Sequence, residues 1–354
     1  MYSESDIEAA VAAGALTPEA ASQLRDFTVR NRALPVADEE HFRLLTGFND
    51  IFVGIAAVIL LLAVGWIANT LPPKIEGVGP SLFAGFFVAA AAWGLAEFFT
   101  RRRRMALPSI ILLLAFVGGV FVTSAVALVL AVGSEAVQNN EQLGTALLAG
   151  AAAIAAGAAW LHWRRFRVPI TVAAGTAAIV GLVIFALASA VDVTGPRDPL
   201  LLSVMLLLGL SVFSFAMWWD SSDPKRETRR SDVAFWLHLL AAPLIVHPVF
   251  ALLGLTDGGA GPAEAALVIL LYVLLGLAAV AVDRRALLVS ALAYVLYALN
   301  GLFQTYGAVE LSFAFTALVI GSALLMLSAF WAQTRRAVLG PLPASLRGRL
   351  APVG

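Results

Sequence analysis

Long apolar runs, each about 20 residues in length and each ended by a short break, dominate the sequence. A helix rises about 1.5 Å per residue, so a run of this length matches the roughly 30 Å hydrocarbon core of a bilayer. Hydrophobic residues make up 60% of the chain and charged residues only 13%, which is too little polar material to cover a soluble protein. The runs do not alternate, which favours helices over barrel strands. The sequence therefore predicts an all-α, polytopic transmembrane helical bundle.

The breaks between the runs set the expected number of spans. The strings "NTLPPKIEGVG", "DVTGPRDP" and "LTDGGAGPAE" combine proline and glycine with polar residues, as expected where helices end. Counting the apolar windows gives about ten transmembrane helices. We expect these helices at 51–71, 79–99, 107–132, 143–163, 168–191, 199–219, 232–254, 263–282, 286–305 and 309–333.

Arginine and lysine are distributed unevenly among the junctions. Every second junction, starting with the one between the second and third spans, carries a basic cluster, and the others hold almost none. Short basic loops remain in the cytoplasm, so this alternation predicts that both termini lie inside. We interpret the arginines as topology anchors that also suit anionic lipid headgroups; a phosphate-binding or nucleic-acid-binding role is the alternative. The anchors are Arg101, Arg102, Arg103, Arg104, Arg164, Arg165, Arg167, Arg229, Arg230, Arg284 and Arg285.

The basic clusters recur about every 60 residues, which is the length of one helical hairpin. The strings "AAWGLAEFFTRRRRMALPSIILL" and "AAWLHWRRFRVPITVAA" both run from Ala-Ala-Trp through arginines to a proline that opens the next span. The period has two explanations. Either the hairpin was duplicated, or any chain of transmembrane helices joined by short loops shows such a period. Small residues at four-residue spacing predict close helix packing in the fourth and fifth spans. These residues are Ala149, Ala153, Gly157, Ala173, Ala177 and Gly181.

The segments outside the spans are short. We expect the cytoplasmic N-terminal segment, 1–48, to form a helical hairpin, since Gly14 suits a helix end and Thr17-Pro18 a helix start. This segment is too small for an independent core and is expected to dock on the cytoplasmic face or on a protein partner. The other divisions are a ten-helix transmembrane domain, 49–334, and a cytoplasmic tail, 335–354.

These features together resemble a group of bacterial proteins. The segment "GALTPEAASQL" ahead of many spans, the repeated arginine hairpins, and a tail with Leu-Pro, arginine and Leu-Ala-Pro carry the likeness. They resemble bacterial multi-pass inner-membrane proteins grouped as a domain of unknown function. The resemblance extends over most of the chain and includes no catalytic motif. It implies a bacterial inner (plasma) membrane location and brings no activity.

Few ionisable residues fall within the spans, where a charge is costly and often functional. Glu97 lies about one turn before Arg101 and is expected to pair with that cluster at the cytoplasmic interface. His162 lies beside the next cluster and is also expected at the interface. Asp232 and Ser231 open the seventh span, where an N-cap role accounts for the carboxylate.

The seventh span also holds two of the four histidines, His238 and His247, and two interior prolines. The histidines are nine residues apart, so they face opposite sides of a straight helix and form no i, i+4 metal pair. Depth along the helices places polar side chains of the last four spans in one layer of the outer half. This layer predicts either a small ligand pocket open to the periplasm or interhelical hydrogen bonds. Its residues are His247, Asn300, Tyr297, Tyr272 and Thr316.

The sequence carries no signature of a particular reaction. It has no P-loop, G-x-S-x-G or H-E-x-x-H motif and no cysteine, and its zero net charge gives no overall field for nucleic acid. We therefore expect a non-enzymatic sensor, scaffold or assembly partner without a cofactor. Its expected partners are the lipid bilayer, anionic headgroups and a protein bound by the N-terminal hairpin. The alternative is a secondary transporter of a small solute that uses the outer-half site, and an enzyme using His247 ranks last.

Overall fold

The described part of the chain is almost entirely helical. The computed structural model describes residues 10–24, 48–75, 79–191, 193, 195, 197–224, 226, 228–255, 262–284, 288, 292, 296, 312–341, 343 and 350, without side chains at 262–265, 312–317 and 329. Within these residues the only β feature is an isolated bridge between Lys74 and Ser81. The all-α bundle predicted from the sequence is confirmed.

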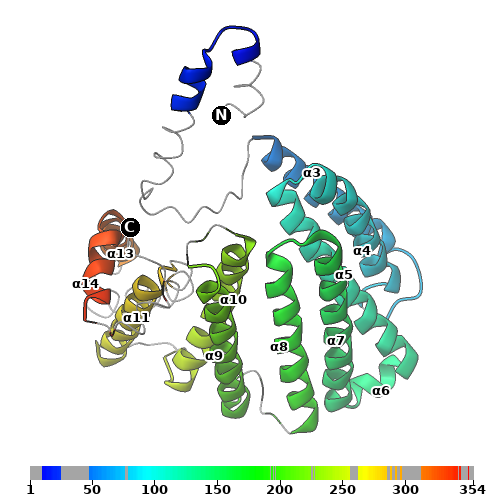
Figure 1. Ribbon diagram of the computed structural model, residues 1–354. Coiled ribbons are helices and arrows are strands. Elements are labelled where there is room, and N and C mark those ends of the chain that lie inside the picture. The colour runs from blue at the N-terminus through cyan, green and yellow to red at the C-terminus, as the bar shows by residue number, and fades with distance from the viewer. Residues whose placement is uncertain are drawn as a thin grey trace.

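From α3 to α11 the described helices follow one another along the chain (Figure 1). In chain order they are α3 (Phe48–Ala68), α4 (Leu82–Ala96), the π-helix η1 (Glu97–Arg102), α5 (Ala106–Val132), α6 (Ser134–Gln138), α7 (Glu141–Phe166), α8 (Ile170–Ala190), α9 (Pro199–Ser221), α10 (Arg229–Leu252), α11 (Pro262–Val282), α13 (Ser312–Ala329) and α14 (Trp331–Leu339).

Seven helical stretches in the described residues are long and apolar enough to cross a membrane, or eight if one bent pair is a single span. They are α3, α4 with η1, α5, α7, α8, α9 and α10, and they match the first seven expected spans. Large apolar side chains such as Phe52, Trp66 and Leu207 are exposed on them, as a lipid-facing surface requires. The chain is thus a multi-pass helical membrane protein.

The last three expected spans have three different outcomes. The span expected at 263–282 coincides with α11, whereas nearly all of 286–305 lies outside the described residues. The span expected at 309–333 is not one continuous helix, because α13 and α14 meet at a 73° bend. Arg335, expected at the start of a cytoplasmic tail, lies within α14 and is buried; the side of the membrane on which it lies stays a prediction. The count of ten helices stays a prediction.

The hairpins α4–α5, α7–α8 and α9–α10 lie side by side, and α11, α13 and α14 gather beyond α10 (Figure 1). Helix α10 lies between these two groups. Of its apolar window, 56% is buried, against 22–28% for the other long helices. Its buried side chains pack on α8 and α9 on one side and on α11 and α13 on the other. This central position explains why α10 tolerates polar side chains that lipid would not solvate.

Glycines bring the paired helices into backbone contact. A Cβ placed on Gly85 of α4 would lie 2.5 Å from the carbonyl oxygen of Gly119 in α5, and one on Gly209 of α9 would lie 2.7 Å from that of Leu244 in α10. Only glycine permits these approaches. The small-residue stripe expected on α7 is wrong in part, since Ala153 and Gly157 are exposed. The buried face of α7 is instead formed by Ala149, Ala151, Ala152, Ala155 and Ala159.

Among the described residues, one in each of the four basic junctions has a left-handed backbone. Arg104, Arg167, Arg226 and Asp283 have φ of 54°, 56°, 55° and 60°. Non-glycine residues adopt this region uncommonly, and Arg104, Arg167 and Arg226 each lie where the chain reverses between two apolar helices. The four positions recur at the period of the basic clusters. Whether the hairpins arose by duplication stays a prediction.

The described part of the N-terminal segment comprises helical residues 10–12 and 18–24. Gly14 has φ of 70° in the turn between them. The Thr17 hydroxyl accepts a hydrogen bond from the Ala20 amide at 3.2 Å, which is the N-cap predicted from Thr17-Pro18.

Candidate functional site

The outer-half site predicted from the sequence is only partly visible. His247 is half-buried in α10, and Tyr272 of α11 packs against the cluster that contains Val246 and Phe250. The Tyr272 hydroxyl is buried without a hydrogen-bond partner among the described residues. Tyr297, Asn300 and the side chain of Thr316 lie outside the described residues, so the grouping stays a prediction.

The densest polar cluster in the described residues lies elsewhere, where α9 ends and α10 begins. Arg284, which follows α11, is 2% exposed and forms a two-pronged ion pair with Asp220 of α9. Its Nη2 lies 2.6 Å from Oδ1, and its Nε lies 3.3 Å from Oδ2. The same Nη2 donates to the Ser231 hydroxyl at 3.2 Å. His238 of α10 is fully buried, and its Nε2 lies 3.7 Å from Asp220 Oδ2.

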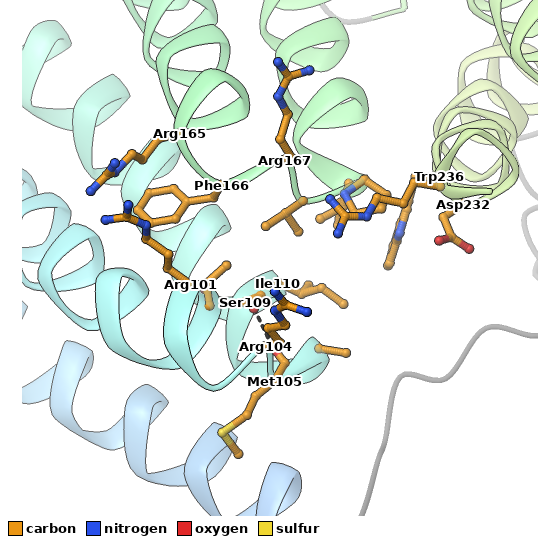
Figure 2. A pocket seen from close by; sticks show the side chains of 16 residues that line it. Arg101, Arg104, Met105, Ser109, Ile110, Arg165, Phe166, Arg167, Asp232 and Trp236 are labelled. Atoms are coloured by element: carbon orange, nitrogen blue, oxygen red, sulfur yellow. Dashed lines mark hydrogen bonds between the residues drawn. The ribbon is translucent and has the colours of Figure 1, made fainter. Parts of the chain in front are cut away.

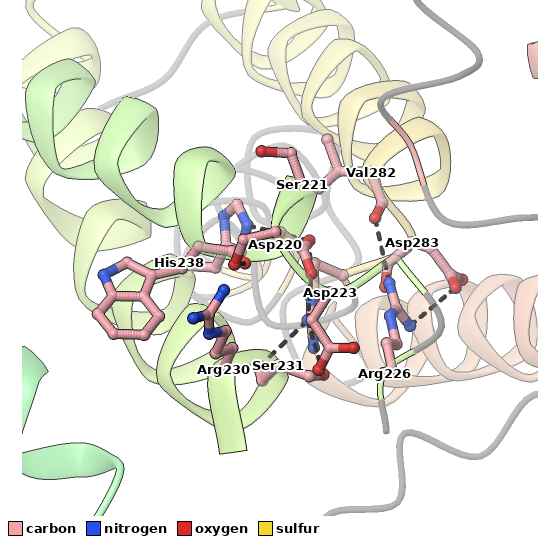
Figure 3. Close-up of polar contacts among 12 residues, drawn as sticks. Asp220, Ser221, Asp223, Arg226, Arg230, Ser231, His238, Val282 and Asp283 are labelled. Atoms are coloured by element: carbon pink, nitrogen blue, oxygen red, sulfur yellow. Dashed lines mark hydrogen bonds and ion pairs between the residues drawn. The ribbon is translucent and has the colours of Figure 1, made fainter. Parts of the chain in front are cut away.

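A second tier of contacts surrounds Asp283, the residue before Arg284. Figure 3 shows Arg226 reaching across to it. Arg226 Nη1 lies 2.9 Å from the Asp283 carboxylate, and its Nη2 donates to the Asp283 carbonyl at 3.0 Å. From α14, Trp331 Nε1 donates to Oδ1 at 2.7 Å and Arg335 lies 3.7 Å from Oδ2. We call the two tiers together the polar joint; its residues are Asp220, Arg226, Ser231, His238, Asp283, Arg284, Trp331 and Arg335.

The polar joint fixes the relative positions of four helices. Charges as buried as Arg284 and Asp220 lose most of their hydration, and only a matched partner with further hydrogen bonds offsets that loss. The planar guanidinium supplies this geometry, since it pairs with both carboxylate oxygens at once. The joint therefore holds α9, α10, α11 and α14 in register at the end of the bundle where the basic junctions lie.

The second feature of this end is a cavity of about 450 Å³ between three junctions. It lies where η1 gives way to α5, where α7 gives way to α8, and at the start of α10. Figure 2 shows Arg101 and Arg165 at one side of it and Asp232 with Trp236 at the other. We call it the arginine cavity. Its charged lining residues are Arg101, Arg104, Arg165, Arg167, Arg229 and Asp232.

Three helices begin at the arginine cavity. Met105 and Pro169 precede the first residues of α5 and α8, and neither start has a side-chain cap. The start of α10 is capped by Thr228, whose hydroxyl accepts from the Arg230 amide at 3.2 Å. The N-cap role expected for Asp232 or Ser231 is therefore wrong; Asp232 lines the cavity instead.

One carboxylate links two arginines at one side of the cavity. Glu97, at the start of η1, lies 3.2 Å from Arg101 and accepts two hydrogen bonds from Arg165 of α7, at 2.7 and 3.0 Å. The expected Glu97–Arg101 pair is thus confirmed, and the Arg165 contact adds a link between two hairpins. The widened π turn also places Thr100 in the cavity lining. Its hydroxyl oxygen is buried without a hydrogen-bond partner among the described residues.

Aromatic rings pack around His162. This residue is fully buried in the bundle, and its expected depth at the membrane interface stays a prediction. Its ring centre lies 4.6 Å from that of Phe166, a cavity-lining residue, and 6.1 Å from that of Trp93. Its Nδ1 lies 3.2 Å from the Thr171 hydroxyl, and its Nε2 has no hydrogen-bond partner among the described residues. The neighbourhood is that of a packed core, not of a surface.

The sequence singled out the arginines but not the residues that organise them. Asp220, Asp283, Thr100 and Trp331 belong to the two features described above and carried no local signal. Arg284 was assigned as a topology anchor, yet it is buried in the polar joint. In the described residues no group of three or more histidines, aspartates or glutamates is placed to hold a metal ion.

Comparison with known proteins adds no relative. No family model, no curated protein and no solved structure matches the chain. The resemblance to bacterial proteins of a domain of unknown function therefore rests on the sequence pattern alone, and function has to be argued from the two features at the basic end.

Proposed function

We propose that the chain is a non-enzymatic sensor or assembly scaffold of the bacterial inner membrane, with both termini in the cytoplasm. Its working surface is the arginine end, which comprises the junctions 101–106, 164–170, 222–230 and 283–284. The supporting observation is that the polar joint fixes this end while arginines remain exposed around it. A surface that recognises a partner gains from such preorganisation, since less ordering is needed on binding.

The orientation follows from the same residues. The junctions are adjacent in space, because Glu97 contacts Arg165, the arginine cavity joins three junctions, and Arg226 contacts Asp283. Exporting so many cations across the membrane is disfavoured. The arginine end therefore faces the cytoplasm, where anionic headgroups and cytoplasmic proteins are its partners. The N-terminal hairpin contributes to protein binding at the same face.

Site-specific photo-crosslinking in cells tests this proposal. A photoreactive amino acid replaces Arg102 or Arg230, both exposed at the arginine end, or Glu135 or Asn139, both exposed at the opposite end. We expect the same discrete protein adduct from the first two positions and none from the second two. Adducts of equal yield from both ends, or none from the arginine end, would contradict the proposal.

A secondary transporter of a small solute is the second candidate. The buried Tyr272 hydroxyl without a described partner favours it, because such a group needs a hydrogen bond. It lies beside the Val246–Phe250 turn that also carries His247. A solute that binds there raises the unfolding temperature of the wild type but not of His247→Ala or Tyr272→Phe. If no compound in a panel of metabolites and metal ions raises the unfolding temperature of the wild type, the transporter proposal is wrong.

A further inference from the structure

We propose that the arginine cavity binds a phosphate-bearing anion, either the headgroup of an anionic lipid or a soluble phosphorylated compound. This inference rests on the arginine end being the working surface, and it names the ligand class that this surface recognises. Five arginines and a single aspartate line the cavity. Its volume of about 450 Å³ exceeds that of a phosphate group and lies within the range of small-molecule sites.

The charge balance of the lining favours an anion. Arg101 and Arg165 share Glu97 at one side of the lining. Arg104, Arg167 and Arg229 form no ion pair with any described carboxylate. The five lining arginines are exposed to water, and the lining holds only one carboxylate to offset their positive charge. A bound dianion offsets this positive charge and accepts hydrogen bonds from planar guanidinium donors.

The backbone supports the same conclusion. Helices α5 and α8 both begin at the cavity without a side-chain cap, so the amides of Ala106, Leu107 and Ile170 have no helical carbonyl partner there. The helix dipole places partial positive charge at these starts. Arg104 and Arg167 precede them in matching left-handed conformations, with φ of 54° and 56°. Two junctions that share a sequence pattern thus build two similar walls of one site.

A separate observation comes from Thr100. It lines the cavity, is 8% exposed, and its hydroxyl oxygen has no hydrogen-bond partner within the described residues. A buried hydroxyl without a partner is unfavourable. A phosphate oxygen in the cavity offers an acceptor for this hydroxyl, whereas the surrounding arginines, which only donate, do not.

Asp232 allows the effect of charge on anion binding to be tested by removing a negative charge as well as by removing positive ones. It is the one carboxylate of the lining and lies on the side away from Arg101 and Arg165 (Figure 2). It repels a bare phosphate, but it accepts a hydrogen bond from a hydroxyl or ammonium attached to the phosphate. Asp232→Asn is therefore expected to bind inorganic phosphate several-fold more tightly than the wild type.

The experiment uses the full-length protein in detergent and compares two variants of equal charge. In the cavity variant, Arg104→Gln and Arg167→Gln remove two lining arginines. In the control variant, Arg102→Gln and Arg164→Gln remove two arginines from the same junctions that lie outside the lining. Titration with inorganic phosphate at constant ionic strength tests the soluble source. Native mass spectrometry of protein extracted from vesicles of phosphatidylglycerol and phosphatidylcholine tests the lipid source.

We expect at least about tenfold weaker binding by the cavity variant, and binding within about twofold of wild type by the control variant. Selective binding of phosphate identifies a soluble compound, and selective retention of phosphatidylglycerol identifies a headgroup. Equal weakening in both variants, or no binding of either probe by the wild type, overturns the inference. The cavity variant is checked for folding by its unfolding temperature without ligand, which removal of like charges is expected to leave unchanged or raise.

The outcome is separable from the test of the proposed function. If the Arg230 cross-link persists in the cavity variant while phosphate binding is absent from the wild type, the scaffold proposal stands and the ligand inference fails. If phosphate binding follows the cavity but no protein adduct forms at the arginine end, the ligand inference stands and the scaffold proposal fails.

Discussion

Arg284 and Asp220 lie 64 positions apart in the chain, yet the Arg284 Nη2 is 2.6 Å from the Asp220 Oδ1 within a buried cluster. This pair connects the second residue after α11 to the last turn of α9. A buried ion pair is not by itself a source of net stability, because the desolvation of both charges opposes their attraction. Here the pair fixes the relative positions of the helices, since it forms only when the ends of three helices meet.

The pair predicts a strong asymmetry between single and double substitutions. Asp220→Ala leaves the Arg284 charge buried without its partner and is expected to lower the free energy of unfolding by about 3–5 kcal/mol. Adding Arg284→Ala removes that charge, so the double variant is expected to lose less than the sum of the two single losses. Unfolding in mixed micelles measures both. Arg101→Ala, at an exposed pair, serves as the control and should have little effect; strictly additive losses would exclude the pairing.

The contact between α4 and α5 gives a prediction with an adjacent control. Gly119→Ala places a Cβ 2.6 Å from the Gly85 carbonyl oxygen and is expected to destabilise the protein by about 1–3 kcal/mol. Gly118→Ala meets nothing within 4 Å and is expected to be neutral or to stabilise by up to about 1 kcal/mol. Unfolding of the two variants side by side checks the packing, and equal effects would show that these helices are not in backbone contact.

His162 tests whether a buried histidine is structural. Its neighbours are aromatic and its Nδ1 contacts Thr171. His162→Phe alone leaves the Thr171 hydroxyl without that contact, whereas the pair His162→Phe with Thr171→Val replaces both polar groups by apolar ones. The double variant is expected to be as stable as wild type, because an apolar replacement of both partners is nearly neutral. A large loss in the double variant would show that His162 has a further role.

Trp331 tests the outer tier of the polar joint. Trp331→Phe keeps most of the buried ring and removes the donor to Asp283. The expected loss is about 1–2 kcal/mol, the contribution of a partly buried hydrogen bond to a charged acceptor. Trp160→Phe is the control, because Trp160 is 59% exposed and its replacement should change the unfolding little. A Trp331→Phe variant as stable as this control would mean that α14 is not anchored through Asp283.

Features set by local sequence were predictable. The first seven spans follow from apolar length alone, and the seven long helical stretches between Phe48 and Leu252 match them within a few residues. The Thr17 cap and the Glu97–Arg101 pair are contacts between residues three and four apart, so local spacing specifies them. The positions of the basic junctions also required nothing beyond counting arginines.

Features set by tertiary contact were not predictable. In "AVDRRALLV" nothing marks Arg284 as buried, because its partner Asp220 lies in a different hairpin. The arginine cavity needs three helix starts to converge, and Thr100 enters it only because a π turn widens the end of α4. The stripe on α7 was misplaced because alanine-rich sequence offers several equivalent faces, and only the neighbouring helices select one of them.

The most direct test is to determine on which side of the membrane the arginine end lies. The chain has no cysteine, so a single introduced cysteine reports its own position without background. Arg102→Cys and Arg230→Cys mark the arginine end, and Glu135→Cys and Asn139→Cys mark the opposite end. We expect a membrane-impermeant maleimide to label the second pair in intact cells and the first pair only after the membrane is opened. Labelling of Arg102→Cys and Arg230→Cys in intact cells would contradict this expectation.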